Sequence, residues 1–163
     1  MLRRELDLAE RGRGRVVLVT ADPGVGKTRL LAEFRARVES RALVLVGHGP
    51  LAATIPFGIV AEPLEAHLAG LRDQRGGQPP GAPSEAFSAI LRGAPDGGVG
   101  PSGLQALTVI RDLLVALAAG RPLVIALDDL HQADRSSWEL VAYLARNPPA
   151  APLLAVASSR IAP

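Results

Sequence analysis

Nearly unbroken runs of apolar residues alternate along the chain with stretches in which apolar residues recur every three or four positions. Short unbroken runs rich in Val, Ile and Leu are typical of strands that are buried on both faces of a parallel sheet. Strands of this kind are expected at residues 15–20, 42–46, 122–127 and 153–157.

A spacing of three or four residues between apolar positions indicates a helix with one buried face. Helices of this kind are expected at residues 2–11, 57–72 and 104–119, directly after Thr28, and around Trp138. Because strands that alternate with helices pack as a mostly parallel sheet covered by those helices, the pattern predicts an α/β fold.

The chain has 163 residues, which is the size of one ordinary domain. The stretch 76–103 is dense in Gly and Pro, and we expect it to form a mobile excursion from this domain, 1–163. The absence of cysteine excludes disulfides and thiolate metal sites. Every apolar run is shorter than a membrane-spanning helix requires and nothing resembles a signal peptide, so we expect a cytoplasmic protein without membrane contact.

The basic residues are almost all arginine: of the eighteen lysine and arginine residues, only Lys27 is a lysine. The formal net charge is only +2, and the arginines between residues 3 and 15 fit a solvated helix face, so we expect no direct contact with nucleic acid. Arginine can replace lysine at most surface sites, but not where a compact ammonium group must sit between phosphate oxygens. The single lysine therefore marks a candidate phosphate-binding position.

Lys27 lies in a glycine-rich loop between an expected strand and an expected helix. Residues 21–28 read Ala-Asp-Pro-Gly-Val-Gly-Lys-Thr and match the phosphate-loop pattern Gly-x-x-x-x-Gly-Lys-Ser/Thr except at the first position. In this pattern backbone N–H groups surround a phosphate, the lysine bridges β- and γ-phosphate oxygens, and the hydroxyl of Thr28 binds Mg²⁺. The expected nucleotide contacts are Ala21, Asp22, Pro23, Gly24, Val25, Gly26, Lys27, Thr28 and Arg29.

Ala21 stands where the pattern has glycine, and it would strain the turn if that position required a positive φ angle. The alternative interpretation of the loop is a glycine-rich turn that contains a lysine by chance. The order of strand, loop and helix, together with the uniqueness of Lys27, favours the phosphate loop over that alternative.

Two acidic residues follow the third expected strand. Asp128 comes directly after an apolar run, so the strand carries it to the same edge of the sheet as the phosphate loop, where it is expected to hold Mg²⁺ through water. Asp129 is expected to orient and activate a water molecule. The alternative is that the two carboxylates cap the next helix. Arg160 ends the fourth expected strand and is expected to contact the γ-phosphate; the alternative is an exposed arginine without that role.

Three segments together resemble a known family. Residues 16–34 are similar to the Walker A region of bacterial AAA-type or STAND regulatory ATPases, which open large LuxR-type transcriptional regulators. Residues 127–134, Leu-Asp-Asp-Leu-His-Gln-Ala-Asp, resemble their Walker B region, which usually has Trp in place of Gln132. Residues 157–160 match the strand and arginine that follow, whereas the upstream motif that often contacts adenine is reduced to residues 2–5.

The resemblance implies a P-loop NTPase fold, a three-layer α/β sandwich, with ATP rather than GTP as the nucleotide and with Mg²⁺. It also implies that the strands lie side by side in the order 42–46, 122–127, 15–20 and 153–157. A fifth strand, a helical lid and any effector domain are expected to be missing after Arg160. The chain therefore resembles a truncated ATPase core, or a fragment of a longer product.

The resulting hypothesis is an ATP-dependent regulatory switch that signals to a protein partner or to a C-terminal effector domain. Lys27 is expected to stabilise charge in the transition state and Asp129 to assist the attacking water. Hydrolysis is expected to be slow, because no arginine finger can be assigned. Two alternatives are a P-loop small-molecule kinase, for which 76–103 supplies no row of arginines, and a non-catalytic interaction fragment that no longer binds nucleotide.

Overall fold

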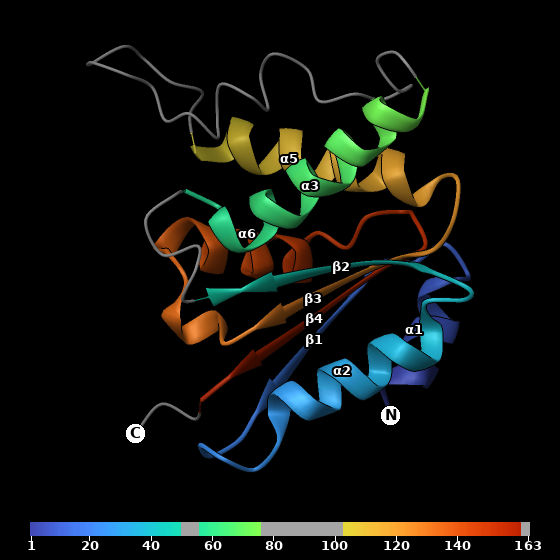
Figure 1. The fold of residues 1–163 in the computed structure, drawn as a ribbon. Helices are drawn as coiled ribbons and strands as arrows, with labels where there is room; N and C mark the ends of the chain where they lie inside the picture. The colour runs from blue at the N-terminus through green and yellow to red at the C-terminus, as the bar shows by residue number, and fades with distance from the viewer. Residues whose placement is uncertain (50–55, 76–102, 161–163) are drawn as a thin grey trace.

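The computed structural model of the chain describes residues 1–49, 56–75 and 103–160 (Figure 1). Each of the four apolar runs forms a strand of one parallel sheet in this part of the chain. The strands are β1 (Arg15–Thr20), β2 (Leu43–His48), β3 (Leu123–Asp128) and β4 (Leu153–Ser159). Every residue of β3 and β4 is buried, as expected for strands that are covered on both faces.

Helices cover both faces of the sheet. Those in the described ranges are α1 (Leu2–Ala9), α2 (Lys27–Val38), α3 (Gly58–Arg75), α5 (Gly103–Ala118) and α6 (Arg135–Arg146), with a short 3₁₀ turn, η2 (Leu130–Gln132), after β3. Figure 1 shows α1 and α2 on one face and α3, α5 and α6 on the other. The predicted three-layer α/β fold is therefore confirmed, while residues 76–102 of the predicted excursion lie outside the described residues.

The strands lie in the order β1-β4-β3-β2, so that β4 pairs with both β3 and β1. The expected order, which put residues 15–20 between 122–127 and 153–157, is wrong. All four runs are continuously apolar, so the sequence pattern does not distinguish a central strand from an edge strand. Burial does distinguish them, because β4 is buried throughout whereas Leu18 of β1 is 48% exposed. The carboxyl end of β4 thus lies between the carboxyl ends of β1 and β3.

Two groups of buried apolar side chains hold the helices against the sheet. One group lies on the side of α3, α5 and α6 and includes Ile59, Ile110 and Leu140. The other lies on the side of α1 and α2 and includes Leu6 and Phe34. Burial of each such side chain contributes about 1.5–3 kcal/mol. Within the described residues, no helix combines the length and the apolar character that a membrane crossing requires.

The start of α3 and the turn after β3 both approach the end of β2 closely. A Cβ atom added to Gly47 would lie 1.7 Å from the carbonyl oxygen of Ile59, the second residue of α3. A Cβ atom added to Gly49 would lie 2.2 Å from the carbonyl oxygen of Asp129. Because both contacts involve main-chain atoms, they leave no room for a side chain at either position. The end of β2 therefore sets where the Asp129 turn and α3 lie.

Asp134 connects the start of α6 to the start of α3. Its carboxylate caps α6 by accepting hydrogen bonds from the N–H of Ser137, at 3.0 Å, and from the Ser137 hydroxyl. It also accepts a hydrogen bond from the N–H of Phe57, at 3.1 Å. Phe57 precedes α3 and has a φ of +60°, a conformation that is unfavourable for a bulky residue. One carboxylate therefore stabilises two helix starts.

We expect Asp134→Ala to lower the free energy of unfolding by about 2–3 kcal/mol, because a helix cap contributes about 1 kcal/mol and an N–H that loses its buried partner costs about 1–3 kcal/mol. Urea unfolding followed by circular dichroism measures this change. Asp112→Ala is the matched control, because Asp112 is exposed on α5 and its ion pair with Arg111 contributes less than about 1 kcal/mol. Equal losses in the two variants would contradict the connecting role of Asp134.

Candidate functional site

The glycine-rich loop leaves the end of β1 and runs into α2 (Figure 1). Gly24 and Gly26 have φ angles of +80° and +93°, in the left-handed region that other residues rarely adopt. A Cβ atom on either glycine would meet no protein atom within 4 Å. Backbone conformation, and not crowding, therefore requires glycine at these two positions.

Ala21, the one departure from the phosphate-loop pattern, fits the loop without backbone strain. Among the described residues, Phe57 and Asp129 are the non-glycine residues with positive φ, so the backbone of Ala21 lies in an ordinary region. Its N–H donates to the carbonyl oxygen of Ser159 at 3.4 Å, which links the start of the loop to the end of β4. This position therefore does not need glycine in the folded chain.

The loop brings the positive end of α2 and the ammonium group of Lys27 together. α2 begins at Lys27, its N-cap Gly26 supplies no side-chain hydrogen bond, and its first turn contains no acidic residue. The unpaired N–H groups and the dipole of such a helix end favour an anion. Lys27 Nζ donates to the carbonyl oxygens of Ala21 and Asp22, at 2.8 and 2.9 Å, and is thereby held within the loop.

A cavity of about 550 Å³ joins this loop to the residues that follow β3 and β4. Its volume falls in the range of small-molecule sites, about 300–1,000 Å³. The lining residues are Pro23, Gly24, Gly26, Lys27, Thr28, Arg29, Ala32, Asp129 and Arg160. Of the expected loop contacts, only Ala21, Asp22 and Val25 do not line it. The fold thus brings Lys27, Asp129 and Arg160 to one cavity from three separate segments.

Asp128 and Thr28 line a second cavity, of about 140 Å³, which shares Thr28 and Ala32 with the larger one. Asp128 ends β3 and is only 5% exposed. A hydroxyl and a carboxylate are oxygen ligands of the kind that Mg²⁺ prefers, and Mg²⁺ is commonly held by one or two carboxylates together with substrate phosphates and water. The described residues contain no group of three or more His, Cys, Asp or Glu that suits a metal ion. The oxygen atoms of Thr28 and Asp128 suit a Mg²⁺ ion that phosphates and water would also ligate.

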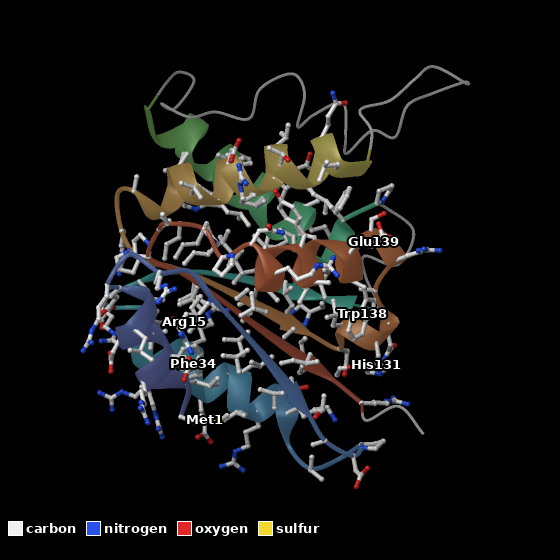
Figure 2. All side chains as sticks on the ribbon, turned by 180° about the vertical axis from the view of Figure 1, so that it is seen from behind. Met1, Arg15, Phe34, His131, Trp138 and Glu139 are labelled. Atoms are coloured by element: carbon white, nitrogen blue, oxygen red, sulfur yellow. The ribbon has the colours of Figure 1, made fainter. Side chains whose placement is uncertain are left out.

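Asp129 reaches the larger cavity from a strained turn. Its φ and ψ are +55° and +47°, a left-handed conformation that costs a non-glycine residue about 1–3 kcal/mol and is common at functional sites. Its N–H donates to Ser158 Oγ at 2.9 Å. Figure 2 shows His131 on the turn after β3, and His131 Nδ1 lies 3.8 Å from Asp129 Oδ1. This ring nitrogen is buried and has no hydrogen-bond partner among the described residues.

Neither side chain of the acidic pair caps the following helix. The N-cap of α6 is Asp134, and Asp129 makes no side-chain capping bond to η2, so the capping alternative is wrong. Asp128 instead accepts a hydrogen bond from the hydroxyl of Ser158, at 2.6 Å. Sequence reasoning did not single out Ser158. Its signal was the polar pair Ser158–Ser159, which ends an apolar run as the two aspartates do.

Comparison with known proteins places these features in a wider group. A family model described as AAA ATPase domain matches residues 1–156, a range that includes the loop and the acidic pair but not Ser158 or Arg160. An uncharacterized protein of Rhizobium meliloti (strain 1021) is 29% identical over 176 residues, which cover 91% of this chain and 16% of that protein. The chain therefore spans about one sixth of the length of this curated relative.

Proposed function

The chain belongs to the AAA ATPase domain family, and from this premise we propose that it binds ATP at the larger cavity, with Mg²⁺ beside it at Thr28 and Asp128, and hydrolyses the ATP slowly. The observation that carries the proposal is the meeting of three segments at that cavity. Lys27 comes from the start of α2, Asp129 follows β3, and Arg160 follows β4. The carboxyl edge of a parallel sheet is also where α/β proteins bind nucleotides.

Different groups of the chain would bind the phosphates of ATP and the Mg²⁺ ion. The N–H groups of the loop and of the first turn of α2 surround the β-phosphate, and Lys27 exchanges its two carbonyl partners for phosphate oxygens. Thr28 and Asp128 are the residues that would hold Mg²⁺, Asp128 through water. When bound, Mg²⁺ neutralises charge on the β- and γ-phosphates.

Hydrolysis needs a water oxygen to bond to the γ-phosphorus while the bond from that phosphorus to the β–γ bridging oxygen breaks, which yields ADP and phosphate. Asp129 orients the water and accepts its proton, Lys27 stabilises the negative charge of the transition state, and Arg160 contacts the γ-phosphate. Turnover is slow because aspartate is one methylene shorter than the glutamate common at this position. No arginine finger is assigned among the described residues, which lowers the rate further.

The proposed role of this chemistry is regulatory. Residues 127–134 resemble the Walker B region of regulatory ATPases that open LuxR-type transcriptional regulators, which supports a switch rather than a metabolic enzyme. The curated relative is much longer than the matching segment, which supports a module that works beside further domains. ATP binding changes the surface that a protein partner or an effector domain contacts, and hydrolysis restores it.

Titration of the purified chain with a fluorescent ATP analogue and Mg²⁺ tests this proposal. We expect saturable binding that ATP displaces, and an affinity at least tenfold lower in Lys27→Ala, which corresponds to about 1.4 kcal/mol. The reason is that Lys27 is the ammonium group of the loop and lines the cavity. Arg146→Ala is the control, because Arg146 is an exposed cation at the far end of α6.

The outcomes separate the alternatives. Displacement by ATP but not by GTP supports an adenine nucleotide as the ligand. A folded wild-type chain that binds no nucleotide overturns the proposal and favours the interaction fragment. Equal affinities in wild type and Lys27→Ala would mean that the analogue binds somewhere other than the loop cavity.

A further inference from the structure

Ser158 lies at the carboxyl end of β4, between the phosphate loop and the acidic pair. It pairs with Val19 of β1, and the preceding residue pairs with Leu127 of β3, so Ser158 stands beside Asp128. Its side chain is fully buried, with an exposed fraction of 0%. A buried hydroxyl at this point must find its hydrogen-bond partners in the neighbouring strand end.

The hydroxyl of Ser158 contacts both members of the acidic pair. It donates its proton to Asp128 Oδ1, at 2.6 Å, and it accepts a hydrogen bond from the N–H of Asp129, at 2.9 Å. A serine hydroxyl has a single proton to donate, so this donor is committed to Asp128. A hydrogen bond to a carboxylate is stronger than one between neutral groups, and it holds the carboxylate in one orientation.

One of the two hydrogen bonds orients a side chain, and the other fixes a backbone conformation. The bond to Asp128 sets the orientation of a side chain that shares a cavity with Thr28. The hydrogen bond from the N–H of Asp129 fixes the main chain at this residue, whose backbone is left-handed with a φ of +55°. Without that anchor, the strained turn loses a partner that compensates its unfavourable backbone conformation.

We propose that Ser158 is a positioning residue of the nucleotide site: through one hydroxyl it orients Asp128 toward Mg²⁺ and fixes the turn that presents Asp129 to the attacking water. This inference rests on the proposed function. Ser158 itself does not line the larger cavity, so it acts through its two neighbours rather than on the nucleotide. If Ser158 only packed within the sheet, its replacement would weaken the sheet as a whole and would not act mainly on Asp128 and Asp129.

The first test uses the chain without ligand. In Ser158→Ala, we expect the amide proton of Asp129 to exchange with solvent at least tenfold faster, because its acceptor is removed, while amides inside β3 keep their protection. Ser158→Thr keeps a hydroxyl and is expected to exchange as wild type does. Ser159→Ala is the control, because the Ser159 hydroxyl donates to the carbonyl oxygen of Arg160 instead. Faster exchange throughout β3 and β4 in Ser158→Ala would overturn the proposal in favour of simple packing.

The second test measures nucleotide affinity with Mg²⁺ and with EDTA. Mg²⁺ is expected to raise the nucleotide affinity of the wild-type chain above the affinity in EDTA. In Ser158→Ala we expect this increase to be at least fivefold smaller, with the affinity in EDTA unchanged. Ser158→Thr, which keeps a hydroxyl, is expected to show the wild-type increase. A variant with the wild-type gain, or with equal losses in both buffers, overturns the positioning role alone. If the wild-type chain binds no nucleotide, or binds it as well as Lys27→Ala does, the proposed function fails and this inference fails with it.

Discussion

Asp129→Asn is expected to lower the rate of ATP hydrolysis about 100-fold or more, while the affinity for ATP stays within a few-fold of the wild-type value. The amide occupies nearly the same volume as the carboxylate but cannot accept the proton of the attacking water. Asp129 lines the larger cavity and is not one of the proposed Mg²⁺ ligands, so binding does not depend on it. Phosphate release in a single-turnover assay, with protein in excess over ATP, measures even a slow rate.

Two further variants make this result interpretable. Asp129→Glu lengthens the side chain by one methylene and is expected to hydrolyse ATP at least as fast as wild type. Glu139→Gln removes a carboxylate from the exposed side of α6 (Figure 2) and is expected to leave the rate unchanged. If Asp129→Asn keeps more than a tenth of the wild-type rate, Asp129 is not the residue that accepts the proton.

Gly47→Ala is expected to lower the free energy of unfolding by about 3 kcal/mol or more. The added Cβ atom would lie 1.7 Å from the carbonyl oxygen of Ile59, and a main-chain oxygen cannot rotate away as a side chain can. The start of α3 must therefore move away from β2. The change is large, because small proteins are stable by only about 5–15 kcal/mol. Urea unfolding measures it as a shift of the midpoint, provided that the dependence of the unfolding free energy on urea concentration is the same in both chains.

The matched control for this variant is a glycine of α3, the helix that packs against β2. Gly70 is inside α3 and a Cβ atom there would meet nothing within 4 Å, so Gly70→Ala is expected to stabilise the chain by about 0.5–1 kcal/mol. A loss below about 1 kcal/mol in Gly47→Ala would show that β2 and α3 can separate easily.

Element positions followed closely from the spacing of apolar residues. β1 occupies the expected 15–20, and α5 differs from the expected 104–119 by one residue at each end. β4 runs two residues beyond the expected end, to Ser159, because Ser158 and Ser159 pair with β1. A strand ends where its main chain stops pairing with a neighbouring strand, and the polarity of its side chains does not predict that point.

The sequence points to candidate site residues where one segment carries the whole signal. Lys27 and Thr28 belong to a local pattern of loop and helix, and Asp128 and Asp129 directly follow an apolar run. Ser158 also follows an apolar run, but its role does not follow from that run, because it depends on two residues that lie 30 and 29 positions away in the chain. The roles given to all these residues remain predictions until the variants are measured.

The amino-acid sequence alone predicted the elements, the α/β class and the glycine-rich loop that holds Lys27 at the entry to a helix. These features depend on hydrophobic spacing and on the backbone preferences of residues within one segment. Three features are visible only in the folded chain: β4 lies between β1 and β3, Asp129 adopts a left-handed backbone, and Ser158 joins the acidic pair. These features depend on which distant segments pack together, because strand pairing and buried hydrogen bonds are settled between neighbours in space.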